Sequence, residues 1–203
     1  REALLPGTAR IDASNELDGV ISLSVAGSAL DTAGGSAAIL IGGSGNDTMV
    51  LNASGALTLD ATELGGISAF ETWTLGSNQA YALTLADGNN GSGALTINGA
   101  AATSNALVIN GSADTNGTLA ITGGSVGDTI TGGAGADTLT GGGGNDILDG
   151  GSGADTFVFA ATAGANGTDT ITNYIRGTDK IDLKAFETVG ALVNLSGATD
   201  ALA

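Results

Sequence analysis

Four consecutive nonapeptides contain the residues that could do chemistry. Each has Asp at its sixth position and an apolar residue at its eighth, without any insertion between repeats. The first residues of the repeats are Gly123, Gly132, Gly141 and Gly150, and the aspartates are Asp128, Asp137, Asp146 and Asp155. Glycines allow turns that point carbonyl oxygens inward, and carbonyl and carboxylate oxygens are the ligands that Ca²⁺ prefers. The pattern therefore predicts calcium-binding turns.

This repeat resembles the G-G-x-G-x-D-x-U-x nonapeptide of RTX proteins, which forms a calcium-binding β-roll. In such a roll, successive turns alternate between two sides, so that turns 18 residues apart stack and share ions. The resemblance implies that Asp128 pairs with Asp146, and Asp137 with Asp155. The first repeat departs from the pattern, because Val126 stands where Gly is usual. The expected ligand turns include Gly124, Asp128, Gly133, Gly135, Asp137, Gly142, Gly144, Asp146, Gly151, Gly153 and Asp155.

An isolated fifth nonapeptide runs from Gly42 to Val50. Its candidate ligands are Gly43, Gly45 and Asp47, but it needs a partner turn that the sequence does not identify. The alternative for all these repeats is a flexible Gly-rich linker. A linker has no reason to keep Gly, Asp and an apolar residue in phase through four repeats, so we expect several bound calcium ions.

A second period predicts the elements that position the turns. Four 12-residue segments begin at Tyr81, Gly93, Asn105 and Gly117, and each contains two apolar residues separated by one other residue. Alternation of this kind between Gly, Asn and Ser turns predicts short strands, and its strict repetition predicts stacked rungs. We therefore predict an all-β fold, a parallel β-solenoid or β-roll with calcium-binding turns.

Four segments are expected along the chain. Residues 1–80 form an irregular β-solenoid with the isolated RTX turn at 42–50, and residues 81–122 form the solenoid of 12-residue period. The nonapeptide roll covers 123–158, and a flanking segment covers 159–203. Within the first segment, Ala61 to Glu71 is expected to be a short helix or a lateral loop. The rungs of the second segment should continue into the roll without a flexible linker.

Composition excludes several classes of function. The formal net charge is −16 and only five residues are basic, so binding to nucleic acid through a basic patch is not expected. The absence of His and Cys excludes thiol nucleophiles, Ser-His-Asp triads and His/Cys zinc sites. No run of 18 apolar residues is present, so membrane insertion is not expected either. The many carboxylates instead favour a calcium counter-ion.

The C-terminal part resembles the end of type I-secreted RTX proteins, including serralysin-like proteases. The resemblance rests on Phe157-Val-Phe159, Gly167 to Ile171 and Gly177 to Leu183. It implies further ligands at Asp169 and Asp179, although ordinary turn residues are the alternative, and Asn173 stands where the family often has Asp. It also implies recognition by the type I secretion machinery through a signal after Leu183, with folding in calcium outside the cell.

Two functions remain open, and neither makes this chain an enzyme. The first is a structural module of a bacterial surface protein, S-layer or adhesin, that self-associates or binds cell-surface glycan or lipopolysaccharide. The second is the carrier module of a secreted enzyme such as a serralysin-like protease or lipase. Ice binding through a Thr-rich face is suggested by Thr129, Thr131, Thr138 and Thr140 but is disfavoured, because the array breaks at Ile147 and Asp149.

Overall fold

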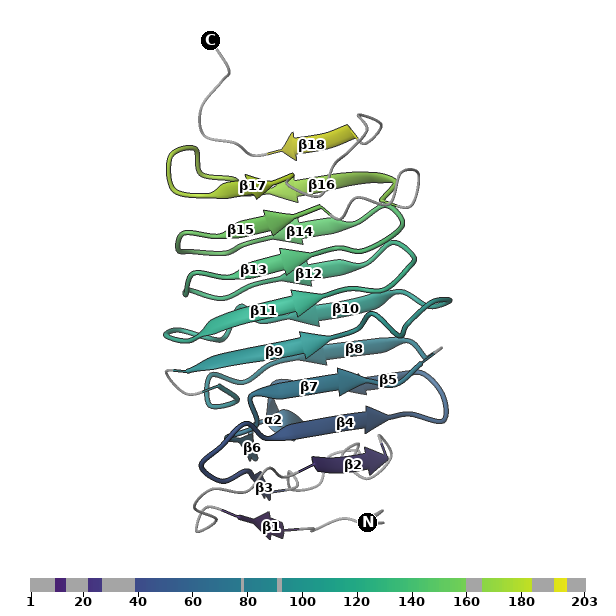
Figure 1. Cartoon of the computed structure of the whole chain (residues 1–203), viewed down its shortest axis with the longest axis vertical. Coiled ribbons are helices and arrows are strands. Elements are labelled where there is room, and N and C mark those ends of the chain that lie inside the picture. Colours follow the sequence, from purple (N-terminus) through teal and green to yellow (C-terminus); the bar gives the residue numbers. More distant parts are fainter. Residues whose placement is uncertain are drawn as a thin grey trace.

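The computed structural model describes residues 10–13, 22–26, 39–77, 79–90, 93–159, 166–183 and 192–196. Its strands form two long parallel sheets and one short one, stacked as the rungs of a solenoid (Figure 1). From β7 onward the chain alternates between the two long sheets, so one rung consists of two strands and the two turns that join them. The predicted all-β parallel solenoid is confirmed.

Each sheet is built from short strands in parallel register. The eight-stranded sheet has the order β17-β15-β13-β11-β9-β7-β4-β2, with bounds Lys180–Asp182, Thr156–Val158, Thr138–Thr140, Thr118–Thr122, Ala94–Asn98, Thr72–Leu75, Thr48–Asn52 and Ser22–Ala26. The seven-stranded sheet has the order β18-β16-β14-β12-β10-β8-β5, with bounds Leu192–Ser196, Thr168–Thr172, Ile147–Asp149, Thr129–Thr131, Leu107–Asn110, Tyr81–Thr84 and Leu57–Leu59. The three-stranded sheet has the order β1-β3-β6, with bounds Arg10–Asp12, Ile39–Ile41 and Ile67–Ser68.

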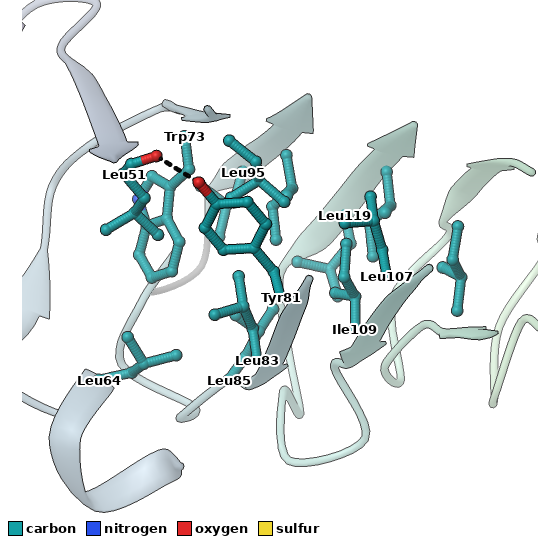
Figure 2. Close-up of a cluster of buried hydrophobic side chains, with 14 of the residues drawn as sticks. Leu51, Leu64, Trp73, Tyr81, Leu83, Leu85, Leu95, Leu107, Ile109 and Leu119 are labelled. Atoms are coloured by element: carbon teal, nitrogen blue, oxygen red, sulfur yellow. Dashed lines mark hydrogen bonds between the residues drawn. The ribbon is translucent and has the colours of Figure 1, made fainter. Parts of the chain in front are cut away.

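The strands bury every second residue, as the period-two pattern predicts. In β9, for example, Leu95 and Ile97 are buried while Ala94, Thr96 and Asn98 are exposed. The inward side chains of the two long sheets meet and form one continuous apolar core along the solenoid. Figure 2 shows the part of this core where Trp73 and Tyr81 lie among leucines and the Tyr81 hydroxyl donates a hydrogen bond to the Leu51 carbonyl at 2.9 Å.

The solenoid continues across the junction between the two periods. Strand β10 of the 12-residue region pairs with β12 of the nonapeptide roll, and β11 pairs with β13. Both pairs are parallel and in register, and no linker intervenes. The expected continuity of the rungs is therefore confirmed.

One helical turn interrupts the rungs near the N-terminal end. Helix α2 (Ala61–Leu64) is capped by Asp60, whose carboxylate accepts hydrogen bonds from the backbone amides of Thr62 and Glu63. Leu64 is buried in the core. Of the two alternatives for this segment, the helix is confirmed for its first part, while the rest supplies strand β6 and the turn that leads into β7.

No helix among the described residues is long and apolar enough to cross a membrane. The export signal expected after Leu183 lies, apart from strand β18, outside the described residues.

Candidate metal centre

The aspartates of the nonapeptides are buried although they lie in turns. Asp128, Asp137, Asp146 and Asp155 are each exposed by only 1–2%. Each directly precedes the strand of its repeat, at the inward-facing position of the alternation. The next inward position of the same strand carries the buried apolar residue, Ile130, Leu139, Leu148 or Phe157. A nonapeptide rung therefore presents one carboxylate and one apolar side chain to the interior from each strand.

The carboxylates on the seven-stranded side form a continuous ladder. The backbone amide of Asp128 donates to Asp146 Oδ1 at 2.8 Å, 18 residues along the chain. The amide of Asp146 donates in turn to Asp169 Oδ1 at 2.9 Å. The ladder begins where the amide of Leu107 donates to Asp128 Oδ1 at 2.7 Å. Asp169 thus occupies the same position in the flanking segment as the aspartates of the repeats.

The eight-stranded side repeats this arrangement. The amide of Asp137 donates to Asp155 Oδ1 at 2.9 Å, again 18 residues along the chain. The amide of Asp155 donates to Asp179 Oδ1 at 3.1 Å, and that of Leu119 donates to Asp137 Oδ1 at 2.8 Å. The stacking expected for the pairs 128/146 and 137/155 is present in the structure, and Asp179 extends the second column.

The second carboxylate oxygen usually closes the aspartate's own turn. The amide of Gly124 donates to Asp128 Oδ2 at 2.6 Å, and the amide of Gly133 donates to Asp137 Oδ2 at the same distance. In the flanking segment, the amide of Ile175 makes the corresponding bond to Asp179 Oδ2 at 2.7 Å. Asp146 differs, because its Oδ2 atom is buried and has no hydrogen-bond partner.

Glycine is required where stacked turns touch. At Gly142, with φ of 102°, a Cβ atom would lie 2.1 Å from the carbonyl oxygen of Gly124 in the turn below. At Gly151, with φ of 85°, it would lie 2.1 Å from the carbonyl oxygen of Gly133. The stacked turns are therefore in direct backbone contact, and the carbonyls of Gly124 and Gly133 accept hydrogen bonds from the amides of Gly143 and Ser152 at 2.9 Å.

The isolated nonapeptide has a partner that the sequence did not identify. The amide of Asp47 donates to Glu71 Oε2 at 2.7 Å, and the amide of Gly43 donates to Asp47 Oδ2 at 2.6 Å. Gly42 donates to the carbonyl of Ser68 at 3.0 Å. The first and third of these bonds match those that join the nonapeptide turns to one another, and the Gly43–Asp47 bond matches the one that closes a single turn. Glu71 is therefore the functional candidate that was missed, and its only signal in the sequence is its place directly before a Thr-initiated strand.

Burial and mutual repulsion make the ionised form of these carboxylates unfavourable when no cation is bound. Burial raises the pKa of Asp146 to about 7, and the neighbouring Asp169 and Asp128 add to that shift. Burial raises the pKa of Asp155 to about 6, with Asp137 and Asp179 contributing. Burial likewise raises the pKa of Asp128, Asp137 and Asp169. Two columns of buried like charges need compensation by a cation or by protons.

The donor set fits calcium. Every candidate ligand supplies oxygen, and the buried Oδ2 atom of Asp146 accepts no hydrogen bond. Among the described residues no three acidic side chains come together as a metal-binding group, so most ligands would have to be turn carbonyls. Calcium accepts such carbonyls readily, whereas Zn²⁺ favours Cys and His.

A comparison with protein families agrees with this geometry. The model of the RTX calcium-binding nonapeptide repeat (4 copies) matches residues 32–53 and 122–157, which include the isolated turn and the four-repeat block. No curated protein and no solved structure matches the chain. The repeats bind calcium ions, and they indicate a calcium-binding module of a type I-secreted protein. The chain carries RTX calcium-binding nonapeptide repeats, and their turns are stacked in a parallel β-roll that continues the apolar solenoid.

Proposed function

We propose that this chain is a non-catalytic, calcium-dependent structural module of a bacterial surface protein, either a surface layer or an adhesin, and that it self-associates outside the cell. The observation that carries the proposal is the uninterrupted run of parallel rungs from β2 to β17 in one sheet. The 12-residue rungs before the roll continue into it in register and add to the same scaffold. No His or Cys is available for hydrolytic chemistry of the common kinds.

The two ends of the eight-stranded sheet supply the means of association. Among the described strands, β2 is outermost at one end and β17 at the other, and both run parallel to the rest of the sheet. A second copy can place its β2 beside β17 of the first, since open sheet edges template further pairing. Such a head-to-tail contact does not close on itself, so it extends into filaments or layers.

Calcium controls this association through charge. A chain with a net charge of −16 repels its own copies, and ions held in the acidic turns reduce that repulsion. Calcium also orders the C-terminal rungs that present β17. We therefore expect assembly only when calcium is bound.

Sedimentation velocity and negative-stain electron microscopy at high protein concentration test the proposal, with calcium at millimolar level or with chelator. We expect filaments or sheets in calcium and monomers in chelator. A single monomer boundary in calcium, without ordered particles on the grid, supports the alternative, a carrier module of a secreted enzyme. A variant with Thr96→Lys on a sheet face and unchanged edges is a control that should still assemble.

A further inference from the structure

One face of the solenoid carries two long columns of uncharged side chains. They are the outward residues at two positions that recur in register through six consecutive strands of the eight-stranded sheet, β4, β7, β9, β11, β13 and β15, whose arrows lie one above another in Figure 1. Eight of the twelve positions are threonine, and we call this surface the threonine face. Its residues are Thr48, Val50, Thr72, Thr74, Thr96, Asn98, Ala120, Thr122, Thr138, Thr140, Thr156 and Val158.

The strand register makes this face a two-dimensional array. Thr48, Thr72 and Thr96 are paired in one column, and Thr74 and Thr122 belong to the other, on either side of Asn98. The columns continue through Thr138 and Thr140. The positions of the array therefore recur at about 4.8 Å along the solenoid and at about 6.7 Å along each strand. Every one of the six strands carries threonine at one of the two positions at least, and β7 and β13 carry it at both. Only a periodic ligand can use such an array over its whole length.

The array continues past the point at which the sequence pattern suggested a break. Ile147 and Asp149 belong to β14 and lie in the seven-stranded sheet. The outward positions that follow Thr138 and Thr140 on the threonine face are Thr156 and Val158. The opposite face is less regular, since it exposes Val108 and Ile147 by 46% and 47% and carries the charged Asp149.

Charge and shape limit the chemistry of the ligand. None of the twelve positions is charged in a chain whose net charge is −16, so neither a polyanion nor a cationic surface is matched. None is aromatic, and the buried Trp73 and Tyr81 cannot stack on a sugar ring. Thr side chains offer a hydroxyl that both donates and accepts, beside a methyl group. A neutral, periodic partner without a need for ring stacking is crystalline water.

We propose that the threonine face binds ice. The hydroxyl groups order water at intervals close to those between oxygen atoms on ice crystal faces, and the methyl groups fill the spaces between them. Each contact is weak, and the regular repetition makes the sum strong. The activity does not depend on assembly of the chain, because it needs only one folded solenoid.

The test is ice-affinity partition and ice-recrystallisation inhibition with the full chain in millimolar calcium. We expect the wild-type chain to be incorporated into a slowly growing ice shell. The variant Thr74→Lys/Thr96→Lys places two charges on the threonine face and should lose incorporation. The matched control Thr58→Lys/Thr84→Lys places two charges on the opposite face, at one exposed and one half-buried position as in the test variant. It should retain incorporation.

Circular dichroism of each variant in calcium establishes that it is folded. Exclusion of the folded wild-type chain from ice overturns the proposal, whatever the variants do. Equal incorporation of the two double variants also overturns it, because the threonine face then plays no part. Retention of the wild-type chain on crystalline cellulose, lost in Thr74→Lys/Thr96→Lys, would assign the face to a polysaccharide instead.

Discussion

The two halves of this solenoid share one backbone register but fill their interior with different chemistry. Strand pairing puts Leu107 beside Asp128 on one side, and Leu119 beside Asp137 on the other. The inward position that carries leucine in the 12-residue rungs thus carries aspartate in the nonapeptide rungs. An upstream strand buries two apolar side chains there, whereas a roll strand buries one and leaves the second place to a carboxylate.

This exchange explains why one region needs calcium and the other has its own core. Each buried leucine contributes about 1.5–3 kcal/mol through burial alone. Each buried aspartate costs free energy unless a cation compensates it. A cation bound at the aspartate columns would therefore supply the stabilisation that the second apolar side chain supplies upstream. We therefore expect only the roll and its flanking segment, and not the upstream rungs, to need calcium in order to fold.

Removal of calcium should have the largest effect and should divide the molecule. With chelator, the roll from 123 onward should lose its β-structure, because binding free energy there is folding free energy. The core around Trp73, the single tryptophan of the chain, should persist. Circular dichroism should show a partial loss of signal while the Trp73 emission stays blue-shifted. A red shift to the emission of a solvated indole would mean that both halves depend on calcium.

Truncation of an upstream core residue should be costly with or without calcium. Leu107→Ala removes a fully buried side chain and should destabilise the upstream region by about 2–5 kcal/mol. Urea denaturation followed by Trp73 fluorescence, in calcium and in chelator, measures the change. A loss seen only in calcium would contradict the view that this half is stabilised by apolar packing.

The corresponding change in the roll should act only through the metal. Asp146→Ala removes the carboxylate that accepts from Asp128 and that has the unpartnered Oδ2 atom, so calcium affinity should fall by at least about 10-fold. Isothermal titration calorimetry measures it. Asp128→Ala combined with Asp146→Ala should cost less than the sum of the single changes, since both serve one ion. Asp87→Ala, an exposed acidic residue of an upstream turn, is the control and should leave affinity unchanged.

Acid should have opposite effects on the two forms of the roll. The pKa of Asp146 is raised from 3.8 to about 7, and that of Asp155 to about 6, so the folded state binds protons more tightly than the unfolded chain. In chelator, this contribution to stability is complete below about pH 4 and is lost as the pH rises through about 6 to 7. Circular dichroism in chelator should therefore show more β-structure at pH 5 than at pH 8.

In calcium the same protons compete with the ion. Calcium affinity measured by calorimetry should fall between pH 8 and pH 6, while upstream stability measured through Trp73 should change little. A calcium affinity that is constant over this range would show that calcium and protons do not compete for the buried carboxylates.

The smallest effect is expected at the isolated turn. Glu71→Ala removes the acceptor of the Asp47 amide, within a region that the apolar core already holds. The loss should be about 1 kcal/mol, the scale of one hydrogen bond, and should not change the number of ions bound by the roll. Glu71→Gln keeps an acceptor and should restore most of the stability. A loss of all calcium binding in Glu71→Ala would mean that the two regions fold as one unit.

Much of this architecture could be predicted from the sequence, because the repeats make each prediction on several rungs at once. The inward leucines of the 12-residue segments follow from their period, and the pairs 128/146 and 137/155 follow from the resemblance to the RTX nonapeptide. Partners without a repeat could not be predicted. Glu71 lies 24 residues from Asp47 and is not preceded by a glycine turn, so only the fold brings it to that turn.

The substitution of leucine by aspartate in register also escaped sequence analysis. The two periods differ in length, and an alignment by apolar residues alone matches Ile121 to Ile130. Such an alignment does not reveal that the preceding inward position changes from leucine to aspartate. The distribution of Thr between the two faces was hidden for a similar reason, since consecutive repeats belong to different sheets.

The central claim is that calcium ions lie between stacked turns, along the two aspartate columns. A crystal structure of the full chain grown in calcium, with an anomalous difference map, tests this most directly. The account predicts anomalous peaks between the turns of Asp128 and Asp146 and between those of Asp137 and Asp155, with ligands from carboxylates and turn carbonyls. Peaks elsewhere, or none at these turns with the carboxylates hydrogen-bonded only to backbone amides, would contradict it.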